Sequence, residues 1–427
     1  MKTTKQFLSL TYLAIGSLAF NVAEAQTKFL KEGQWRGEFK VNEVQVPFNF
    51  EVKGKDAEHA TFTLLNGSRR DDFHVKQIAN DSVFIKMNTY DAALVAKIND
   101  DGTLSGVYKS LVPNFKGNFL PFTAESGKTY RFVEPAKEIQ ANHNLSGKWA
   151  IKIISKEPVA EQVAVFEQKG NKLKGVFLKV TGDTRELEGI VQGDEFTLTG
   201  FSGPSPWLIR GKINPDKSIS GEVGLGIYNN VKFEGVKDKN AELPDAYTLT
   251  HLKEGYEKLD FTLPDLNGKQ VSLSDEKYKG KVVIVEIIGT WCPNCTDQTQ
   301  FLSPWFKANK NRGVEAIAVG FEQKDDLAYA KYTLGKLRDK YDIQYDILFG
   351  GIADKKVASE KFAALNKMIA FPTTIIIGRD GKVKQIHTGY TGEVTGKYFK
   401  QYVKKWNKEL DKLIAEPVPA SEVALNK

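Results

Sequence analysis

The chain has 427 residues, of which 41% are hydrophobic and 26% are charged. This length exceeds what one hydrophobic core usually serves, so we expect two or three domains, and the composition excludes wholesale disorder. The net charge is +7, but the basic residues are scattered among acidic ones, which does not favour a nucleic-acid-binding protein. Because the chain has only two cysteines, it is not a disulfide-dense scaffold.

Residues 1–25 have the pattern of a secretory signal peptide. Lys2 and Lys5 precede a mostly apolar stretch, residues 7–20, that is too short to span a bilayer, and Ala23-Glu24-Ala25 is an A-x-A cleavage site. The alternative for this stretch is a short membrane anchor. No cysteine lies near the cleavage site, so a lipoprotein anchor is not expected. We expect an exported, soluble protein of the periplasm or cell envelope, without a stable membrane anchor.

The next part of the chain, up to about residue 245, has the pattern of β-structure. Short runs of alternating polarity are separated by Gly, Asn and Asp pairs, and no long helical period occurs. This part also contains an internal repeat with an offset of 114 or 115 residues. The repeated segments are 33–35 with 147–149, 66–70 with 181–185, and 97–106 with 212–221. We therefore predict two similar antiparallel β units, residues 26–140 and 141–245, which form two barrels or one shared sandwich.

One repeated segment contains the run Asn99-Asp100-Asp101-Gly102. We expect a hairpin turn there, because Asp-Gly supplies the positive φ values of a tight turn. A calcium site is the alternative. The second copy has Pro215 and Lys217 where carboxylates would be needed, which argues against calcium.

From about residue 250, buried strands alternate with helical segments. This alternation predicts an α/β domain over residues 250–414, followed by a loose tail over 415–427. The expected strands are 281–289, 314–321, 374–378 and 382–387, the last two forming a hairpin, and the expected helices are 295–310, 325–341, 355–368 and 395–414.

The two cysteines lie in the motif Trp291-Cys292-Pro293-Asn294-Cys295, between a buried strand and a helix. A helix N-terminus stabilises a thiolate, so we expect Cys292, at the more exposed end, to attack and Cys295, more buried, to resolve. A structural disulfide is an alternative, but so small a ring stabilises little. A zinc site would need two further ligands, and only His387 is suitably placed. The motif therefore predicts a redox-active dithiol that needs neither a metal nor an organic cofactor.

Further motifs accompany these cysteines in residues 250–414. They are Leu259–Lys269 with Val271-Ser272-Leu273, Gly289-Thr290 before the cysteines, Phe371-Pro372-Thr373-Thr374, and Asp380-Gly381-Lys382. This segment resembles the thioredoxin superfamily, specifically its exported TlpA/ResA-like branch. The resemblance implies a thioredoxin-like fold and the activity of a protein thiol–disulfide oxidoreductase.

The resemblance also implies where a substrate binds. Pro372 is then a cis-proline that lies against the cysteines, in a loop with Phe371 and Thr373 that pairs with an extended peptide. Trp291 flanks the site as an exposed aromatic side chain, and Pro293 completes the substrate-binding set. From the sequence alone, Pro372 could instead begin a strand.

A carboxylate, Glu286, interrupts the apolar run before the cysteines. Burial would raise its pKa towards neutrality and make it a proton acceptor. In thioredoxin an acid at this position helps to deprotonate the resolving thiol, whereas the acid that ResA-like proteins carry three residues after the second cysteine is Gln298 here. The alternative for Glu286 is a buried ion pair with a lysine. His387 and Tyr390 follow the last strand, either near the active surface or as an ordinary polar strand end.

Together these observations predict an exported reductase of protein disulfides, with the β region recruiting or positioning a partner. By resemblance, electrons come from a membrane thiol reductase, and the clients include proteins of cytochrome c maturation. Two alternatives remain. One is a disulfide oxidase or isomerase that uses the same residues, and the other is a ligand- or peptide-binding envelope protein whose CxxC is accessory. A peroxidase is not favoured, because both cysteines belong to one motif.

Overall fold

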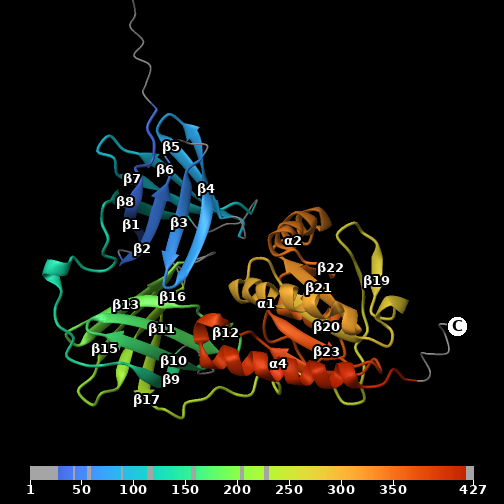
Figure 1. The fold of residues 1–427 in the computed structure, drawn as a ribbon. Coiled ribbons are helices and arrows are strands. Elements are labelled where there is room, and N and C mark those ends of the chain that lie inside the picture. Colours follow the sequence, from blue (N-terminus) through green and yellow to red (C-terminus); the bar gives the residue numbers. More distant parts are fainter. Residues whose placement is uncertain are drawn as a thin grey trace, which may run out of the picture.

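The computed structural model describes residues 27–41, 44–54, 59–87, 90–112, 119–154, 160–201, 206–225 and 230–419. Two β-barrels lie one above the other, and an α/β domain lies beside them (Figure 1). The expected signal peptide and the end of the expected tail lie outside the described residues. Within these ranges no helix has both the length and the apolar character that a membrane crossing requires.

The first barrel is an antiparallel meander that closes on itself, since β1 pairs with both β2 and β8. Its strands are β1 (Gly33–Val41), β2 (Val44–Lys53), β3 (Thr61–Asn66), β4 (Arg69–Ala79), β5 (Ser82–Met87), β6 (Ala92–Ile98), β7 (Leu104–Ser110) and β8 (Phe119–Ser126).

The second barrel repeats this design. It closes where β17 pairs with β9 and β11 pairs with both β10 and β13, and the short β12 adds to β11. Its strands are β9 (Gly147–Ile154), β10 (Ala160–Lys169), β11 (Lys172–Lys179), β12 (Gly182–Asp183), β13 (Leu187–Gln192), β14 (Glu195–Gly200), β15 (Trp207–Ile213), β16 (Ile219–Leu225) and β17 (Asn230–Lys237). The predicted all-β region is confirmed, and its two copies are barrels rather than one shared sandwich.

The internal repeat has the same hydrogen bonds in both copies. Trp35 and Trp149 are buried, and each indole N–H donates at 2.8 Å to a carbonyl four residues earlier. In the repeated turns, Asp101 accepts the N–H of Thr103, and Asp216 accepts that of Ser218. These carboxylates are used within hairpin turns, as the Asp-Gly pattern predicts.

The two barrels are joined through Phe201, which follows β14 of the second barrel. Its ring lies in the core of the first barrel, edge-on to Phe39 at 4.9 Å and to Tyr108 at 5.5 Å. Its backbone N–H donates to the Asn66 side chain at 3.0 Å, and that side chain donates in turn to the Glu186 carbonyl. Because a buried aromatic side chain contributes much apolar contact, this residue fixes one barrel on the other.

The C-terminal domain has a five-stranded sheet in the order β22-β21-β20-β23-β24, with β20, β21 and β22 parallel. Its elements are the hairpin β18 (Thr262–Pro264) and β19 (Gln270–Ser272), the strands β20 (Val282–Ile288), β21 (Val314–Glu322), β22 (Asp346–Ile352), β23 (Thr373–Ile377) and β24 (Val383–Thr388), and the helices α1 (Pro293–Asn309), α2 (Leu327–Tyr341), α3 (Lys355–Lys361) and α4 (Lys397–Ala415). The domain also has the short 3₁₀ turns η2 (Glu276–Tyr278), η3 (Lys310–Arg312) and η4 (Glu393–Thr395), while η1 (Pro135–Lys137) lies between the two barrels.

The predicted α/β architecture is confirmed, with two differences from the predicted elements. The helix expected over 355–368 ends at Lys361, because the following backbone turns away and Asn366 N–H donates to the His251 carbonyl. The edge strand β22 was not predicted, since its glycines and its leading aspartate hide the strand pattern.

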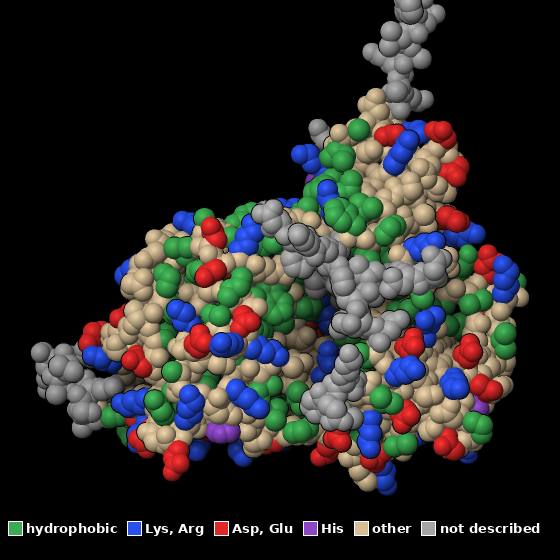
Figure 2. Space-filling view, turned by 180° about the vertical axis from the view of Figure 1, so that it is seen from behind, with side chains coloured by type: hydrophobic (Ala, Val, Ile, Leu, Met, Phe, Trp, Pro, Cys, Tyr) green, Lys and Arg blue, Asp and Glu red, His purple; other side chains and the backbone are tan. Residues whose placement is uncertain are grey.

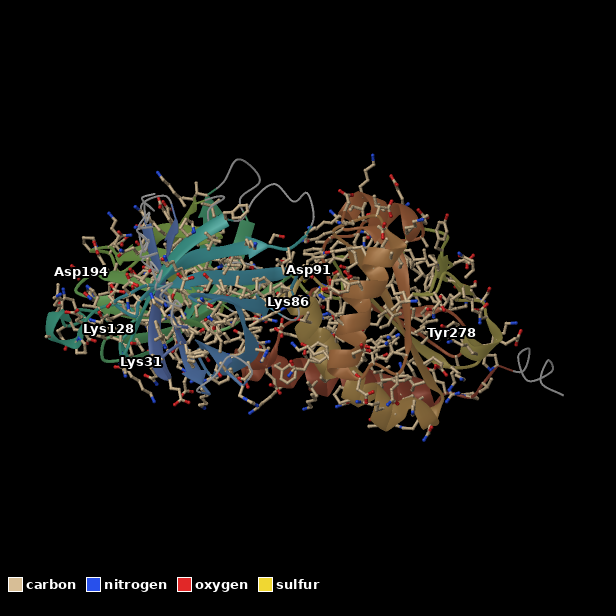
Figure 3. The ribbon with its side chains drawn as sticks, turned by 90° about the horizontal axis from the view of Figure 1, so that it is seen from above. Lys31, Lys86, Asp91, Lys128, Asp194 and Tyr278 are labelled. Atoms are coloured by element: carbon tan, nitrogen blue, oxygen red, sulfur yellow. The ribbon has the colours of Figure 1, made fainter. Side chains whose placement is uncertain are left out.

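Within the α/β domain, α1 contacts α4 through Phe301, whose ring lies edge-on to Phe399 and Trp406. The domain packs against both barrels, and on the side of the second barrel Arg185 pairs with Asp297 of α1 at 2.7 Å. On the side of the first barrel, Lys86 and Asp91 lie at the junction (Figure 3), where Asp91 pairs with Lys336 of α2 at 3.0 Å. Basic and acidic side chains are interspersed over the face shown in Figure 2, in agreement with the mixed charge of the sequence.

Candidate active site

The two cysteines lie at the start of α1, directly after β20. Cys292 is the N-cap, and Pro293 occupies the first turn, where its missing N–H costs nothing. The Cys292 sulfur accepts the N–H of Cys295 at 3.4 Å, and the Cys292 thiol donates to the Phe371 carbonyl at 3.4 Å. The Phe371–Pro372 peptide bond is cis, as the resemblance implies. The structure thus brings the thiols and the proline loop together.

The two thiols differ in their ionisation. Burial opposes ionisation of Cys292, but contacts from the Cys295 thiol and N–H, the charge of Arg185 and the N–H of Asn294 hold its pKa below the ordinary value. Burial, together with the neighbouring Cys292 thiolate, raises the pKa of Cys295 well above the ordinary value. Cys292 therefore ionises more readily than Cys295, which stays protonated.

Glu286 lies in the middle of β20 with no exposed surface. Burial raises its pKa to about 7, although the Tyr345 hydroxyl donates to Oε1 at 2.6 Å. Its Oε2 has no hydrogen-bond partner among the described residues, so no described lysine forms the ion pair considered as the alternative. Its charge also contributes to the raised pKa of Cys295, which places the carboxyl within electrostatic reach of that thiol.

Cys292 is less accessible than the sequence suggests. As expected it is more exposed than Cys295, but only 6% of its surface is exposed, against 0% for Cys295. The turn between β11 and β12 of the second barrel packs against the residues beside Cys292. A Cβ on Gly182 would collide with Asn294, and one on Gly389 would lie 2.7 Å from the Val180 carbonyl oxygen. The second barrel therefore covers the turn of residues 292–295, called here the cysteine turn.

Trp291 also departs from the expectation of an exposed aromatic side chain, since it is half-buried. Its indole N–H donates to the Phe321 carbonyl at 2.9 Å, and its ring lies edge-on to Phe371 at 5.7 Å. Of the other expected substrate-binding residues, Thr373 is fully buried and its hydroxyl donates to the Ala370 carbonyl. Pro372 is buried as well.

His387 and Tyr390 lie among aromatic rings rather than at a polar strand end. The His387 ring is 4.6 Å from Tyr247 and 5.0 Å from Tyr402, and burial lowers its pKa to about 4. The Tyr390 carbonyl accepts the Asn294 side chain at 3.1 Å, which links this loop to the cysteine turn.

Four charged residues near the site were missed from the sequence. Glu322, at the end of β21, is buried, and it accepts the N–H and the hydroxyl of Thr290; burial raises its pKa to about 7. Asp297 follows Cys295 in α1 and pairs with Arg185 at 2.7 Å. Lys179 of β11 lies over the Trp207 ring at 4.8 Å and within electrostatic reach of Cys292. A signal for Arg185 existed, because the repeated segments 66–70 and 181–185 both end in arginine.

Comparison with known proteins agrees with this geometry. The family model described as "AhpC/TSA family" matches residues 255–386. The thiol–disulfide oxidoreductase ResA of Bacillus thuringiensis subsp. konkukian is 31% identical over 151 residues, which is 35% of this chain and 77% of that protein. ResA of Bacillus cereus is 29% identical over 187 residues, 44% of this chain and 90% of that protein.

Among solved structures, a thiol:disulfide interchange protein of the thioredoxin family from Chlorobium tepidum is 16% identical, covers 38% of this chain and 99% of that chain, and has a TM-score of 0.29. The CxxC at the start of α1, the cis-proline loop beside it and the identity with ResA over most of that protein's length lead to one assignment. The chain belongs to the ResA family of thiol–disulfide oxidoreductases.

Proposed function

We propose that Cys292 and Cys295 carry the exchange and that the protein reduces disulfides of other proteins. The Cys292 thiolate attacks one sulfur of a substrate disulfide and forms a mixed disulfide, while the other substrate sulfur leaves as a thiolate and takes up a proton. Cys295 then loses its proton and attacks the Cys292 sulfur. This step releases the second substrate thiolate and leaves a Cys292–Cys295 disulfide, so two electrons have passed to the substrate.

The observation that carries this proposal is the asymmetry of the two thiols. Cys292 is the N-cap of α1 and accepts a backbone N–H, which favours its thiolate. Cys295 is fully buried one turn further on and has a raised pKa. It therefore remains a thiol until the mixed disulfide forms, which is the order that the reaction requires.

Glu286 is proposed to accept the proton of Cys295. A carboxyl whose pKa is about 7 exists in both protonation states near neutral pH, which is the range in which a general base is most effective. Tyr345 holds one oxygen of this carboxyl and leaves Oε2 without a partner among the described residues. The metal-free chemistry of thiol exchange needs no further group.

The substrate is proposed to bind along the loop of Phe371, Pro372 and Thr373, with Trp291 and Pro293 beside it. The contact between the Cys292 thiol and the Phe371 carbonyl supports this, because it places the loop against the attacking sulfur. Since the second barrel covers this region, we propose that the barrels recruit or position the partner protein. The residues of this cover then define which partner reaches Cys292.

The cellular setting is proposed from the sequence. The A-x-A pattern of residues 23–25 supports export to the periplasm or cell envelope. In that compartment the oxidised pair would need electrons from another thiol protein, such as a membrane thiol reductase. Clients in cytochrome c maturation are the proposal that the resemblance to the ResA branch supports.

The test is the reduction potential of the Cys292–Cys295 pair, measured by thiol trapping across a graded redox buffer. A strongly reducing value, near thioredoxin's, is the expected result for a reductase. A strongly oxidising value would contradict the proposed direction of electron flow. A pair that does not exchange with the buffer would contradict the role of these cysteines altogether.

One observation favours a second candidate, a disulfide oxidase or isomerase. The contacts that lower the pKa of Cys292 stabilise the reduced form, and a stabilised reduced form makes a dithiol pair more oxidising. The same potential separates the candidates. A second assay, refolding of a scrambled disulfide-bonded protein, would show isomerase activity directly.

A further inference from the structure

Each barrel presents an arginine to α1. Arg69 is the first residue of β4 in the first barrel, and Arg185 follows β12 in the second barrel. Arg69 Nη1 donates to Asp297 Oδ1 at 3.1 Å, while Arg185 Nε and Nη2 donate to the two oxygens of Asp297 at 2.8 and 2.7 Å. One carboxylate in the first turns of α1 therefore receives an arginine from each barrel.

Arg185 also contacts the cysteine turn itself. Its Nη2 donates to the Pro293 carbonyl at 2.9 Å and to the Thr296 hydroxyl oxygen at 3.1 Å. The Thr296 hydroxyl donates to the same Pro293 carbonyl at 2.7 Å. The Tyr90 hydroxyl of the first barrel lies 3.3 Å from the Thr296 hydroxyl oxygen. These bonds hold the residues on both sides of Asn294 and Cys295, immediately after the attacking sulfur.

The backbone at Arg185 supports the same placement. Its φ is +60°, in the left-handed region that a non-glycine residue rarely occupies. The Arg185 N–H donates to Asp183 Oδ1 at 2.6 Å, and Asp183 Oδ2 accepts the Gly392 N–H at 2.7 Å. Only 3% of Arg185 is exposed. The surrounding contacts thus fix an unfavourable backbone conformation and a buried charge at this one position.

We propose that Arg185 is a positioning residue of the redox centre: its guanidinium, supplied by the second barrel, holds the first turn of α1 and stabilises the thiolate of Cys292. This inference rests on the proposed role of the cysteine pair and extends it, because part of the active site then belongs to the β region. Asp297 sets the strength of the effect, since it pairs with the guanidinium and offsets its charge.

Other groups lie near the two thiols. Lys179 of β11 is within electrostatic reach of both Cys292 and Asp183 of β12, and Glu286 of β20 is within electrostatic reach of Cys295. Burial raises the pKa of the Cys292 thiol, and Cys295 and Arg185 are the first side chains that lower it. Burial also disfavours the charge of Arg185, yet Tyr90 and Asp297 keep its pKa above the ordinary value. The guanidinium therefore stays charged over the range in which the thiol titrates.

The test is the pH dependence of Cys292 alkylation by iodoacetamide in the reduced full-length protein. The midpoint of this profile reports the thiolate, and the plateau at high pH reports access to the sulfur. Arg185→Gln should move the midpoint to higher pH and lower the rate below the midpoint by about threefold to tenfold. Arg185→Lys, which keeps the charge, should restore most of the shift. Asp297→Asn should move the midpoint to lower pH, because it removes the compensating negative charge.

The opposite signs separate positioning from mere docking. If Arg185 only attached the barrel to α1, Arg185→Gln and Asp297→Asn would change the plateau of the alkylation profile and leave its midpoint unmoved. Either that result, or midpoints that move in the same direction in both variants, would overturn the proposal. The matched control is Arg210→Gln, on β15 of the same barrel, where a half-exposed arginine pairs with Glu222; its midpoint should not move.

Should Arg185→Gln fail to fold, Arg185→Lys and Asp297→Asn still decide the matter. A midpoint close to the wild-type value in Arg185→Lys and a lower midpoint in Asp297→Asn support the proposal, and any other combination contradicts it. The titration needs no protein substrate. If the wild-type protein does not exchange with disulfides while the alkylation midpoints behave as expected, then the proposed function fails and the role of Arg185 stands.

Discussion

At the scale of single residues, Glu286 connects the sequence most directly to the chemistry. A carboxylate within an apolar run predicts burial and a raised pKa, and both are found. Its partner Tyr345 could not be predicted, since it lies 59 residues away, in the segment between α2 and β22. The order of exposure of the two cysteines was predicted correctly. The exposure of Trp291 was predicted wrongly, because its ring packs on Phe371 and its indole N–H bonds the Phe321 carbonyl, contacts that the sequence pattern does not show.

Replacing Glu286 by Gln removes the proposed proton acceptor while conserving the shape of the side chain. We expect the release of product from the mixed disulfide to slow by about 10- to 100-fold near neutral pH, because general base catalysis is lost. The first attack by Cys292 should change little. Rapid mixing with a disulfide-bonded peptide, followed by acid quench and mass spectrometry, measures the two steps separately.

The matched control is Glu322→Gln. This glutamate is also buried and its pKa is also raised to about 7, but it bonds Thr290 rather than facing Cys295. Its release step should stay within about twofold of the wild type. Equal slowing in both variants would mean that Glu286 acts through the stability of the domain and not through proton transfer.

Cys295→Ser gives a second prediction at the residue scale. Without the resolving thiol, Cys292 should remain joined to its substrate. A mixed disulfide should therefore accumulate, and a reducing agent should cleave it. Non-reducing gels and mass spectrometry identify the adduct and the attacking cysteine. An adduct that forms equally well in a Cys292→Ser variant would contradict the assignment of Cys292 as the attacking thiol.

At the scale of elements, the sequence predicted the parts that surround the cysteines best. β20 and β21 are continuous apolar runs buried on both faces, and α1 begins at the CxxC, so their patterns are strong. β22 and the early end of α3 were missed because they depend on tertiary pairing. β22 gains its bonds from β21, and the chain after α3 pairs with residues 251–253.

The cover over Cys292 can be tested through one glycine. Gly389 has a φ of +78°, and a Cβ there would lie 2.7 Å from the Val180 oxygen and 2.8 Å from the Thr181 carbonyl carbon. Gly389→Ala should therefore push the β11–β12 turn away from the cysteine turn. We expect the plateau rate of Cys292 alkylation at high pH to rise by about threefold to tenfold, since the sulfur becomes more accessible.

Gly102→Ala is the control for backbone strain. Its φ is +79°, almost the same value, and nothing lies within 4 Å of an added Cβ. Both variants should lose about 1 to 2 kcal/mol of folding free energy from the left-handed conformation, but only Gly389→Ala should speed the alkylation. If the two plateau rates were equal, the turn would not be what limits access to Cys292.

At the scale of the whole molecule, the internal repeat predicted two similar units but not how they meet. Closure into barrels follows from pairings between the first and last strands of each copy, as between Trp35 and Ser126. Phe201, which enters the core of the first barrel, belongs to no repeated segment identified in the sequence. The convergence of Arg69 and Arg185 on Asp297 likewise depends on how three separate units dock.

The free energy of unfolding should depend on pH because of Glu286 and Glu322. Their pKa values are raised to about 7 in the folded protein, so the folded state binds more protons than the unfolded state between pH 4.5 and 7. Their stabilisation is fully present below pH 4.5 and is lost as the pH rises through 7, by up to about 3 kcal/mol for each group. Denaturant unfolding from pH 5 to pH 8 measures this loss.

His387 acts in the opposite sense. Its pKa is lowered to about 4, so its contribution is present above pH 6.5 and is lost as the pH falls towards 4. The double variant Glu286→Gln/Glu322→Gln should lack the loss of stability as the pH rises through 7, and should keep the loss as the pH falls towards 4. Glu195→Gln, an exposed position on β14, is the control and should reproduce the wild-type profile. An unchanged decline in the double variant would exclude these carboxyls as its cause.

The order of the three units along the chain determines when Cys292 becomes covered as the protein folds. The N-terminal part of an exported chain emerges from the export channel first, and domains generally fold as units as they emerge. Both barrels precede the cysteines, so β11, β12 and Arg185 can already be in place when α1 emerges. Helix α1 then docks on a surface that is already folded, and the Cys292 sulfur is enclosed as soon as the last domain folds.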